Sequence, residues 1–229
     1  MKRFRNGGWR VAGSGWVGAL AIVLLLPATR YPLPARAAVV DRIAALVDRQ
    51  VLTVSEITQM EEIRFYPQAS GQSDDDYRHA ILEDLIAQAL RYRDVERFGA
   101  ADVSNDAIEA RLVEIRKRFA SPDEFAAAVQ KAQLTMDEVR ALIKRELQVE
   151  NYIQERFAPM IGVSTDEIEN YYRTTWTQER QTRGLAVLPL TQVQDEIRNE
   201  LKSSRLQDEI DKWTAELRSH ANVDVYTWR

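Results

Sequence analysis

The sequence predicts a mainly α protein, with a multi-helix core and a small β-sheet formed by the N-terminal hairpin of the mature chain and a C-terminal strand. Three observations predict this fold class. Four S/T-x-x-E boxes each precede an apolar stretch with helical periodicity. Short strand-like apolar segments lie at both ends of the mature chain. The chain has 229 residues, of which 45% are hydrophobic, so it is long enough to bury the core of one domain.

Residues 1–37 are predicted to be a secretory signal peptide. Lys2, Arg3, Arg5 and Arg10 form a basic N-terminal region, residues 16–26 are apolar, and a proline-bearing tail ends in an A-x-A pattern at Ala37. Cleavage before Ala38 predicts an exported, periplasmic protein with no stable membrane insertion. The alternative is an uncleaved signal that anchors the chain in the inner membrane, although the strongly apolar part is shorter than the roughly 20 residues a bilayer needs.

Composition excludes several classes of site and partner. The chain has no cysteine, so it cannot form a disulfide, a thiol nucleophile or a Cys-based metal site. Removing the signal peptide, which holds six Lys and Arg residues and no acid, lowers the formal charge from −4 to −10. An acidic mature chain argues against nucleic acid as a partner, because phosphates require a basic surface.

The elements are expected in the following order. Residues 39–53 form a β-hairpin or two short strands, with the turn at 48–50. Helices follow at roughly 54–66, 75–98, 105–119, 122–132, 136–158 and 165–175. Four of them begin at capping boxes, in which the hydroxyl accepts from the N3 amide and the Glu reaches back to the N-cap amide: Thr53, Ser121, Thr135 and Ser164. A last helix spans about 191–219, and strand 223–227 pairs with the N-terminal segment, so that both ends meet in one sheet.

The helical pattern lapses between Arg173 and Thr191, within the stretch "YYRTTWTQERQTRGLAVLPL". Residues 177–190 are therefore predicted to be a connector. It joins a helical region at 38–176 to a C-terminal helix and strand at 191–229, and both parts belong to the same domain.

The sequence predicts no catalytic residue, cofactor or metal site. The two histidines, His79 and His220, are most simply solvated residues at helix ends. Acidic pairs such as Asp137-Glu138 lie in first helical turns, where capping and the helix dipole already explain them.

Aromatic and methionine side chains near helix ends are the candidate residues for binding a polypeptide, because such surfaces suit loose, sequence-tolerant contacts. The alternative is that they fill the core between helices. The candidates are Phe65, Tyr66, Tyr152, Phe157, Met160, Tyr171, Tyr172 and Trp176.

A series of segments resembles SurA-type periplasmic chaperones. "VVDRIAALVDRQVLTVSEI" resembles the opening of that family, and "ILEDLIAQALRYRDVERFG", "VSNDAIEARLVEIRKRF", "SPDEFAAAVQKAQLTMDEVRALIKRELQVENYI" and "VSTDEIENYY" follow in its order. The resemblance covers about 39–172 and resumes at "LTQVQDEIRNEL". It implies a helical chaperone core closed by a returning C-terminal helix and strand, export to the periplasm, and unfolded clients, outer-membrane proteins above all.

The chain departs from the family at the connector. The family carries parvulin prolyl-isomerase domains of roughly a hundred residues there, whereas 174–190 supplies 17 residues and no histidine. The leading hypothesis is therefore a non-enzymatic chaperone or holdase. The alternatives are a folding factor with residual prolyl-isomerase activity and an adaptor that docks one dedicated partner. The sequence leaves the oligomeric state open.

Overall fold

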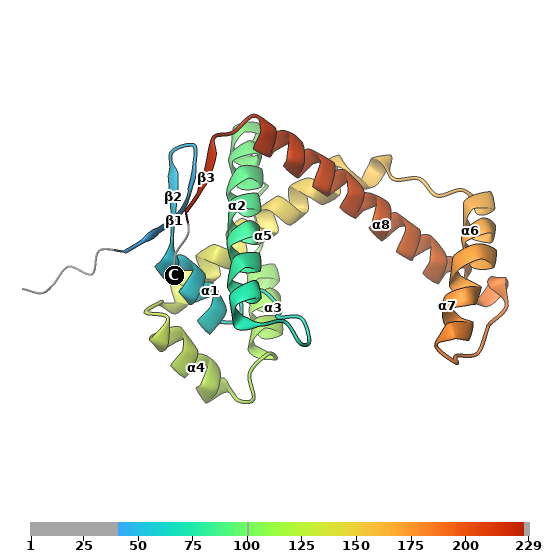
Figure 1. Cartoon of the computed structure of the whole chain (residues 1–229), viewed down its shortest axis with the longest axis horizontal. Coiled ribbons are helices and arrows are strands. Elements are labelled where there is room, and N and C mark those ends of the chain that lie inside the picture. The colour runs from blue at the N-terminus through green and yellow to red at the C-terminus, as the bar shows by residue number, and fades with distance from the viewer. Residues whose placement is uncertain (1–40, 100, 227–229) are drawn as a thin grey trace, which may run out of the picture. The chain divides into compact units, whose positions relative to one another are not determined.

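The computed structural model describes residues 41–99 and 101–226. The predicted signal peptide and its cleavage site at Ala37 and Ala38 lie outside these residues. The elements follow the expected order of hairpin, helices and terminal strand (Figure 1). Their bounds are β1 Ile43–Val47, β2 Gln50–Thr53, α1 Val54–Glu62, α2 Asp74–Phe98, α3 Asn105–Arg116, α4 Pro122–Lys131, α5 Met136–Arg156, η1 Ala158–Met160, α6 Thr165–Tyr171, η2 Tyr172–Trp176, α7 Thr177–Thr182, α8 Leu190–Ser219 and β3 Val223–Val225.

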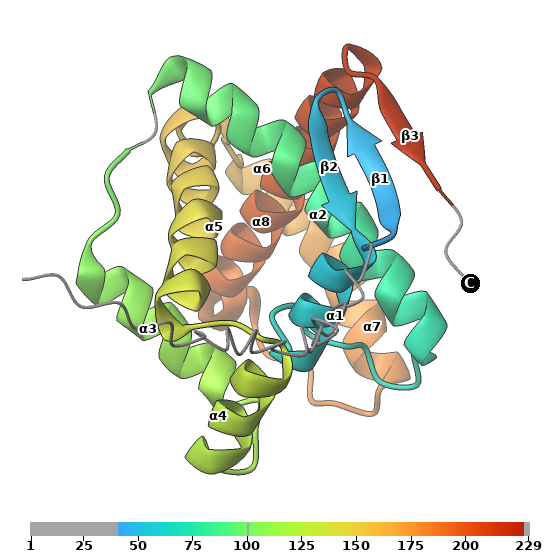
Figure 2. The same cartoon turned by 90° about the vertical axis from the view of Figure 1, so that its left-hand side faces the viewer.

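The sheet confirms that the N-terminal hairpin pairs with the C-terminal strand. Its order is β2-β1-β3, and both pairings are antiparallel (Figure 2). The turn between β1 and β2 holds Asp48 at a φ of 53°, a left-handed conformation that Asp tolerates better than most residues. Asp48 also connects the two termini, because its N–H donates to the Asn222 carbonyl at 2.7 Å and its carboxylate accepts from the Asn222 N–H at 2.8 Å.

The helix starts are close to the predicted positions because side chains cap them. Thr53, Thr135 and Ser164 form complete capping boxes. The fourth predicted box, at Ser121, is only half correct. Its hydroxyl accepts from the Glu124 N–H at 3.1 Å, but the Glu124 carboxylate accepts from the N–H of Ala120 instead of that of Ser121.

Two helices end at left-handed residues that are not glycine. The predicted helix 54–66 ends at Glu62, followed by Arg64 at a φ of 47° and a hydrogen bond from the Phe65 N–H to the Met60 carbonyl. The helix expected over 122–132 ends at Lys131, and Gln133 has a φ of 55°. Both ends have the bonds of the Schellman motif, which usually contains glycine. The sequence therefore carries no clear stop signal at the first of them.

The predicted lapse in helical structure between Arg173 and Thr191 is wrong for its first half. The helix expected over 165–175 continues through the π-helical segment η2 and α7 to Thr182. Thr177 supports the wider turn, because its hydroxyl donates to the Tyr172 carbonyl at 2.7 Å. Only 183–189 lacks helical structure, beginning near Gly184, which has a φ of 66°. The helices expected over 105–119 and 136–158 also end early, at Arg116 and Arg156.

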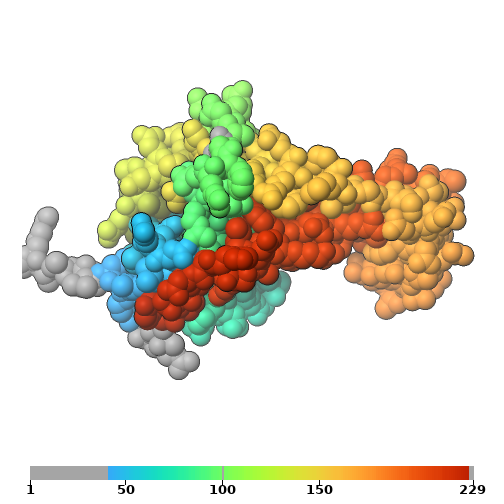
Figure 3. Space-filling model, turned by 90° about the horizontal axis from the view of Figure 1, so that it is seen from above, coloured from blue at the N-terminus to red at the C-terminus, as the bar shows by residue number. Residues whose placement is uncertain are grey.

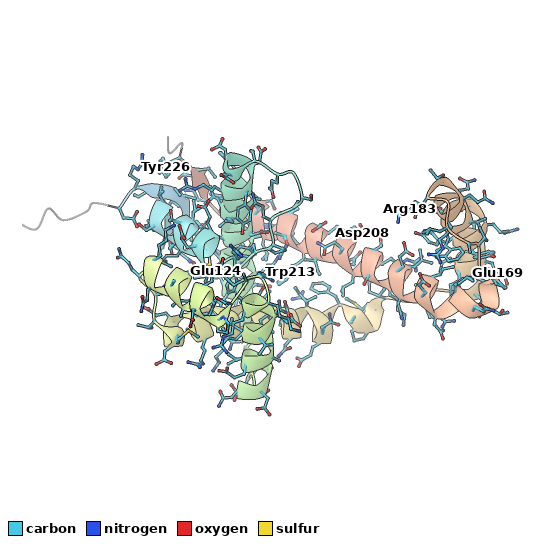
Figure 4. The ribbon with its side chains drawn as sticks, turned by 90° about the horizontal axis from the view of Figure 1, so that it is seen from below. Glu124, Glu169, Arg183, Asp208, Trp213 and Tyr226 are labelled. Atoms are coloured by element: carbon cyan, nitrogen blue, oxygen red, sulfur yellow. The ribbon has the colours of Figure 1, made fainter. Side chains whose placement is uncertain are left out.

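Helix α8 completes two apolar clusters. Its C-terminal half packs Trp213 against Phe157 and other residues of α2 and α5, and Figure 3 shows the surface of α8 beside that of α5. Its N-terminal half packs Val193 and Ile197 against Ile168 of α6. Figure 4 labels Trp213 near one end of this helix, and Arg183 and Glu169 in the α6–α7 region at the other. The largest cluster lies among β1, β2 and α1 to α5. No helix in 41–99 or 101–226 is long and apolar enough to cross a bilayer.

Candidate functional site

The candidate site is a groove of about 320 Å³ between β2, α1, α2 and α5. Each helix contributes residues spaced three or four apart, which places them on one face. These are Glu56, Gln59 and Met60 of α1, Leu85, Gln88 and Ala89 of α2, and Glu138, Ala141, Leu142 and Arg145 of α5. The groove therefore results from three amphipathic helices whose exposed flanks face one another beside an edge strand.

The two Schellman ends supply the remaining apolar wall. In this motif the residue after the left-handed position packs back against the last turn of the helix. Here those residues are Phe65 after Arg64 and Leu134 after Gln133, and both line the groove. Phe65 is held further by Arg118, whose guanidinium donates to the Phe65 carbonyl. The backbone at the ends of α1 and α4 thus positions two of the groove's apolar contacts.

Charged groups lie around this apolar surface. The carboxylates of Glu56 and Glu138 accept the N-cap amides of Thr53 and Thr135, each at 2.7 Å. The Thr135 N–H lowers the pKa of Glu138 below its usual value. The lowered pKa keeps Glu138 anionic at the groove, and the hydrogen bonds hold both carboxylates in fixed positions.

A third carboxylate, that of Glu146, has a different environment. Its side chain is only 22% exposed and lies 3.6 Å from Arg111, which is also 2.6 Å from Glu150. Burial raises the pKa of Glu146 to about 7, and the attraction of Arg111 opposes the rise. Burial likewise raises the pKa of the neighbouring Tyr66 hydroxyl. Glu146 is therefore the group lining the groove that titrates near neutral pH.

The structure distributes the predicted aromatic residues over three places. Phe65 and Tyr66 are the two that lie in the groove, with their rings edge to face at 5.2 Å. Phe65 is buried and Tyr66 is half-buried. The Tyr66 carbonyl accepts a hydrogen bond from the Tyr77 hydroxyl at 2.6 Å, which fixes this segment against α2.

Tyr152 and Phe157 belong to the cluster under α8. Their rings lie 5.6 and 5.4 Å from that of Trp213, and Phe157 is buried. The exposed ring of Phe98 stacks on Tyr152 at 6.5 Å. Met160 lies outside this packing, in η1, with 66% of its surface exposed. These residues do not share a cavity with Phe65 and Tyr66.

Tyr171, Tyr172 and Trp176 lie in the third place, between α6, η2 and α8. Trp176 is buried, and Tyr172 stacks on it at 5.4 Å. The Tyr171 hydroxyl donates to Glu200 at 2.6 Å, a bond that raises its pKa to about 12. The Tyr172 hydroxyl donates to the Leu188 carbonyl at 2.8 Å. This group therefore closes the connector onto α8.

The predicted site residues omit most of the groove. Met60, Leu85, Leu134, Leu142 and Glu146 carry no signal of a binding role in the sequence. They line a cavity because helices distant in sequence leave their flanks uncovered there. The spacing of glutamates and glutamines between the apolar positions of α1 and α5 is the one local hint of a partly wet face.

In the part of the chain that the structure describes, no three or more His, Asp or Glu side chains lie close enough together to hold a metal ion. His79 is exposed on α2, where its Nδ1 lies 2.8 Å from the Asp75 carbonyl. His220 caps the end of α8, with its Nδ1 2.9 Å from the Glu216 carbonyl. The two histidines therefore lie at separate helix sites, and neither lines the groove.

Comparison with known proteins confirms the resemblance read from the sequence. The chain is similar to the protein named Chaperone SurA of Alkalilimnicola ehrlichii, with 28% identity over 170 residues, which cover 72% of this chain and 38% of that protein. It is also similar to Chaperone SurA of Pseudomonas putida (28% over 135 residues, 57% and 32%) and of Saccharophagus degradans (23% over 143 residues, 60% and 33%). The chain matches about a third of the length of these curated relatives. No family model matches it.

Proposed function

We propose that the chain is a periplasmic chaperone of the holdase type, which binds extended segments of unfolded proteins in the groove between β2, α1, α2 and α5. Its clients are outer-membrane β-barrel proteins, and binding involves no catalysis. The observation that carries the proposal is the groove itself, whose lining combines the partly exposed side chains of Leu85, Leu134 and Leu142 with the buried Met60 and Phe65.

Physical chemistry favours reversible binding at this site. Burying apolar client side chains contributes about 25 cal/mol per Å² of surface removed from water. Ordering the client and losing its translational freedom offset most of that gain. A groove of about 320 Å³ accommodates a few side chains of an extended segment. Affinity is therefore modest and release is possible, as a holdase requires.

The similarity to proteins named Chaperone SurA supports the same proposal. The partly exposed Tyr152, Tyr171 and Tyr172 at the other two places remain part of it as secondary contacts, whereas Phe157 and Trp176 are buried. Phe98 and Met160 offer exposed apolar surface there, as do Leu185 and Val187 in the connector. A long client would reach them only after it occupies the groove.

An aggregation assay tests the proposal. The chain is exported from a bacterial host, purified in its processed form, and mixed at equal molar ratio with a urea-unfolded β-barrel protein, which is then diluted into buffer. We expect slower growth of light scattering than with an equal amount of an unrelated acidic helical protein. Equal scattering curves would contradict the holdase proposal.

The same preparation decides between the alternatives. If a protease-coupled assay shows that a proline-containing peptide isomerises faster with the chain than in buffer alone, the result would favour a folding factor with residual isomerase activity. A crosslinking experiment that captures one dominant partner, instead of many outer-membrane proteins, would favour an adaptor.

A further inference from the structure

The hydrogen bonds between β1 and β3 determine which way each backbone group of the sheet points. The Tyr226 N–H donates to the Ala44 carbonyl at 2.9 Å, and the Asp48 N–H donates to the Asn222 carbonyl at 2.7 Å. Even-numbered residues of β1 therefore direct their backbone groups to β3. Since these directions alternate along an antiparallel strand, Ala45 and Val47 direct theirs to β2.

The register extends this alternation to β2. Ala45 is opposite Leu52, and Val47 is opposite Gln50. Leu52 and Gln50 thus bond to β1, and Val51 between them directs its N–H and carbonyl away from the sheet. Val51 is 44% exposed, and β2 is the last strand on this side of the sheet within the described residues. Its outer edge offers one donor and one acceptor to an extended chain.

At the C-terminal end of β2, the outer edge has no free backbone N–H group. Thr53 is the next outward-facing position, and its N–H already donates to the Glu56 carboxylate at 2.7 Å. The capping box of α1 therefore ends the hydrogen-bonding ladder at Thr53 and leaves it open at Val51. A strand added here gains one pair of backbone bonds, so the sheet cannot grow into a long and irreversible assembly.

The groove lies beside this edge. Gln50 and Leu52 face the same side of the sheet, and both line the groove. In Figure 2, β2 is the edge strand on the side of α5, and β3 is the edge strand on the other side. Because side chains alternate along a strand, an added strand would direct every second side chain into the groove. One extended polypeptide segment could therefore pair with the edge of β2 and fill the groove at the same time.

The charged residues of the groove indicate which side chains an extended segment bound there should carry. The carboxylates of Glu56 and Glu138 line the groove, and Arg145 is the cation among its lining residues. An occupant with acidic side chains next to its apolar ones would be repelled, and one with Lys or Arg would be attracted.

We propose that an extended client segment adds to the outer edge of β2 as a further strand, bonding through the N–H and carbonyl of Val51 and placing alternate apolar side chains in the groove. The preferred segment alternates apolar residues with neutral or basic ones. This inference rests on the proposed function, because it specifies how that groove takes its client.

A substitution at each edge of the sheet tests the inference. Val51→Pro removes the outward N–H of β2, and Val225→Pro makes the same change on β3, where Val225 also faces outward but does not line the groove. Proline is tolerated at edge positions whose N–H has no partner in the sheet. The probe is a fluorescein-labelled ten-residue peptide of alternating Phe or Leu and Thr or Lys. We expect its binding to weaken at least tenfold with Val51→Pro and less than twofold with Val225→Pro.

Backbone methylation of the probe gives a second readout that does not alter the protein. N-methylation at the probe residue opposite Val51 should abolish binding to the unmodified chain, and N-methylation at either neighbouring residue should leave it within about threefold, because alternate N–H groups point away from the ladder.

The two proposals fail in different ways. Binding of the probe with no alternating effect of N-methylation would overturn strand addition and leave groove binding intact. An equal loss with both proline variants, together with no alternation, would overturn it as well. If the unmodified chain does not bind the probe at any concentration up to millimolar, the holdase groove itself is wrong.

Discussion

The indole N–H of Trp213 in α8 donates to the carboxylate of Asp94 in α2 at 3.3 Å, across 119 positions of sequence. The same ring packs against Phe157 and Tyr152 of the α5 end, and Asp94 also lies 3.8 Å from Arg156. One side chain of the returning helix thus meets both long helices of the N-terminal region. The C-terminal segment is therefore part of the packed core.

Truncation of this residue should destabilise the whole fold. We expect Trp213→Ala to lower the free energy of unfolding by about 3–5 kcal/mol, the usual cost of removing a buried aromatic ring. Trp213→Phe keeps part of the packing and loses the bond to Asp94, so its loss should be smaller. Met160→Ala, at an exposed site, is the control and should remain within about 0.5 kcal/mol. Urea unfolding followed by circular dichroism measures all three.

Substitutions at two leucines of α5 can distinguish an effect on binding in the groove from an effect on the stability of the core. Leu142 and Leu147 are both partly buried against the same cluster, but only Leu142 lines the groove. Leu142→Gln and Leu147→Gln should therefore cost a similar free energy of unfolding, about 1–3 kcal/mol. Only Leu142→Gln should reduce protection of an unfolded β-barrel client, measured at a temperature where both variants are folded. Equal loss of protection would mean that stability, and not the groove, controls the assay.

Glu146 should make stability depend on pH near neutrality. Its folded pKa of about 7 is above the ordinary value of 4.5, so between these values the folded state holds a proton that the unfolded state has released. The free energy of unfolding therefore falls as the pH rises through this window. The decrease is on the order of 2 kcal/mol by pH 8.

The matching variant is Glu146→Gln, which cannot titrate. It should equal the unmodified chain in urea midpoint at pH 5 and exceed it at pH 8. Arg111 keeps a carboxylate partner in this variant, because Glu150 lies 2.6 Å from it. An identical pH profile in both proteins would show that Glu146 is not the group responsible.

The connector should tolerate insertions. Residues 183–189 are exposed and lack helical structure, and the Tyr172 hydroxyl holds the Leu188 carbonyl close to η2. A ten-residue Gly-Ser insertion between Ala186 and Val187 should cost less than about 1 kcal/mol, because loop-closure entropy grows only with the logarithm of length.

The hairpin turn provides the contrasting site. The same insertion between Asp48 and Arg49 interrupts a two-residue turn that determines the register and contacts Asn222, so it should lower the melting temperature much further. Equal melting temperatures for the two insertions would contradict the distinction between connector and turn.

Local chemistry explains how much of the fold could be predicted. Thr53, Thr135 and Ser164 cap their helices through residues three positions away, so these starts are visible in the sequence itself. The ends at Arg64 and Gln133 were less visible, because the left-handed conformation depends on packing of Phe65 and Leu134 against tertiary neighbours. The continuation of helix through Thr182 was missed because Thr174, Thr175 and Thr177 have weak helical propensity, which contacts with α8 override.

The sequence by itself determined the helical class, most helix starts, the pairing of the two ends in one sheet and the resemblance to SurA-type chaperones, since each depends on spacing along the chain. Only the tertiary structure decided which apolar residues line the groove. Phe65 and Phe157 look alike in sequence, yet one lines a groove and the other lies under Trp213. The groove lies where helices distant in sequence do not pack fully against one another, and only the tertiary arrangement of those helices determines that position.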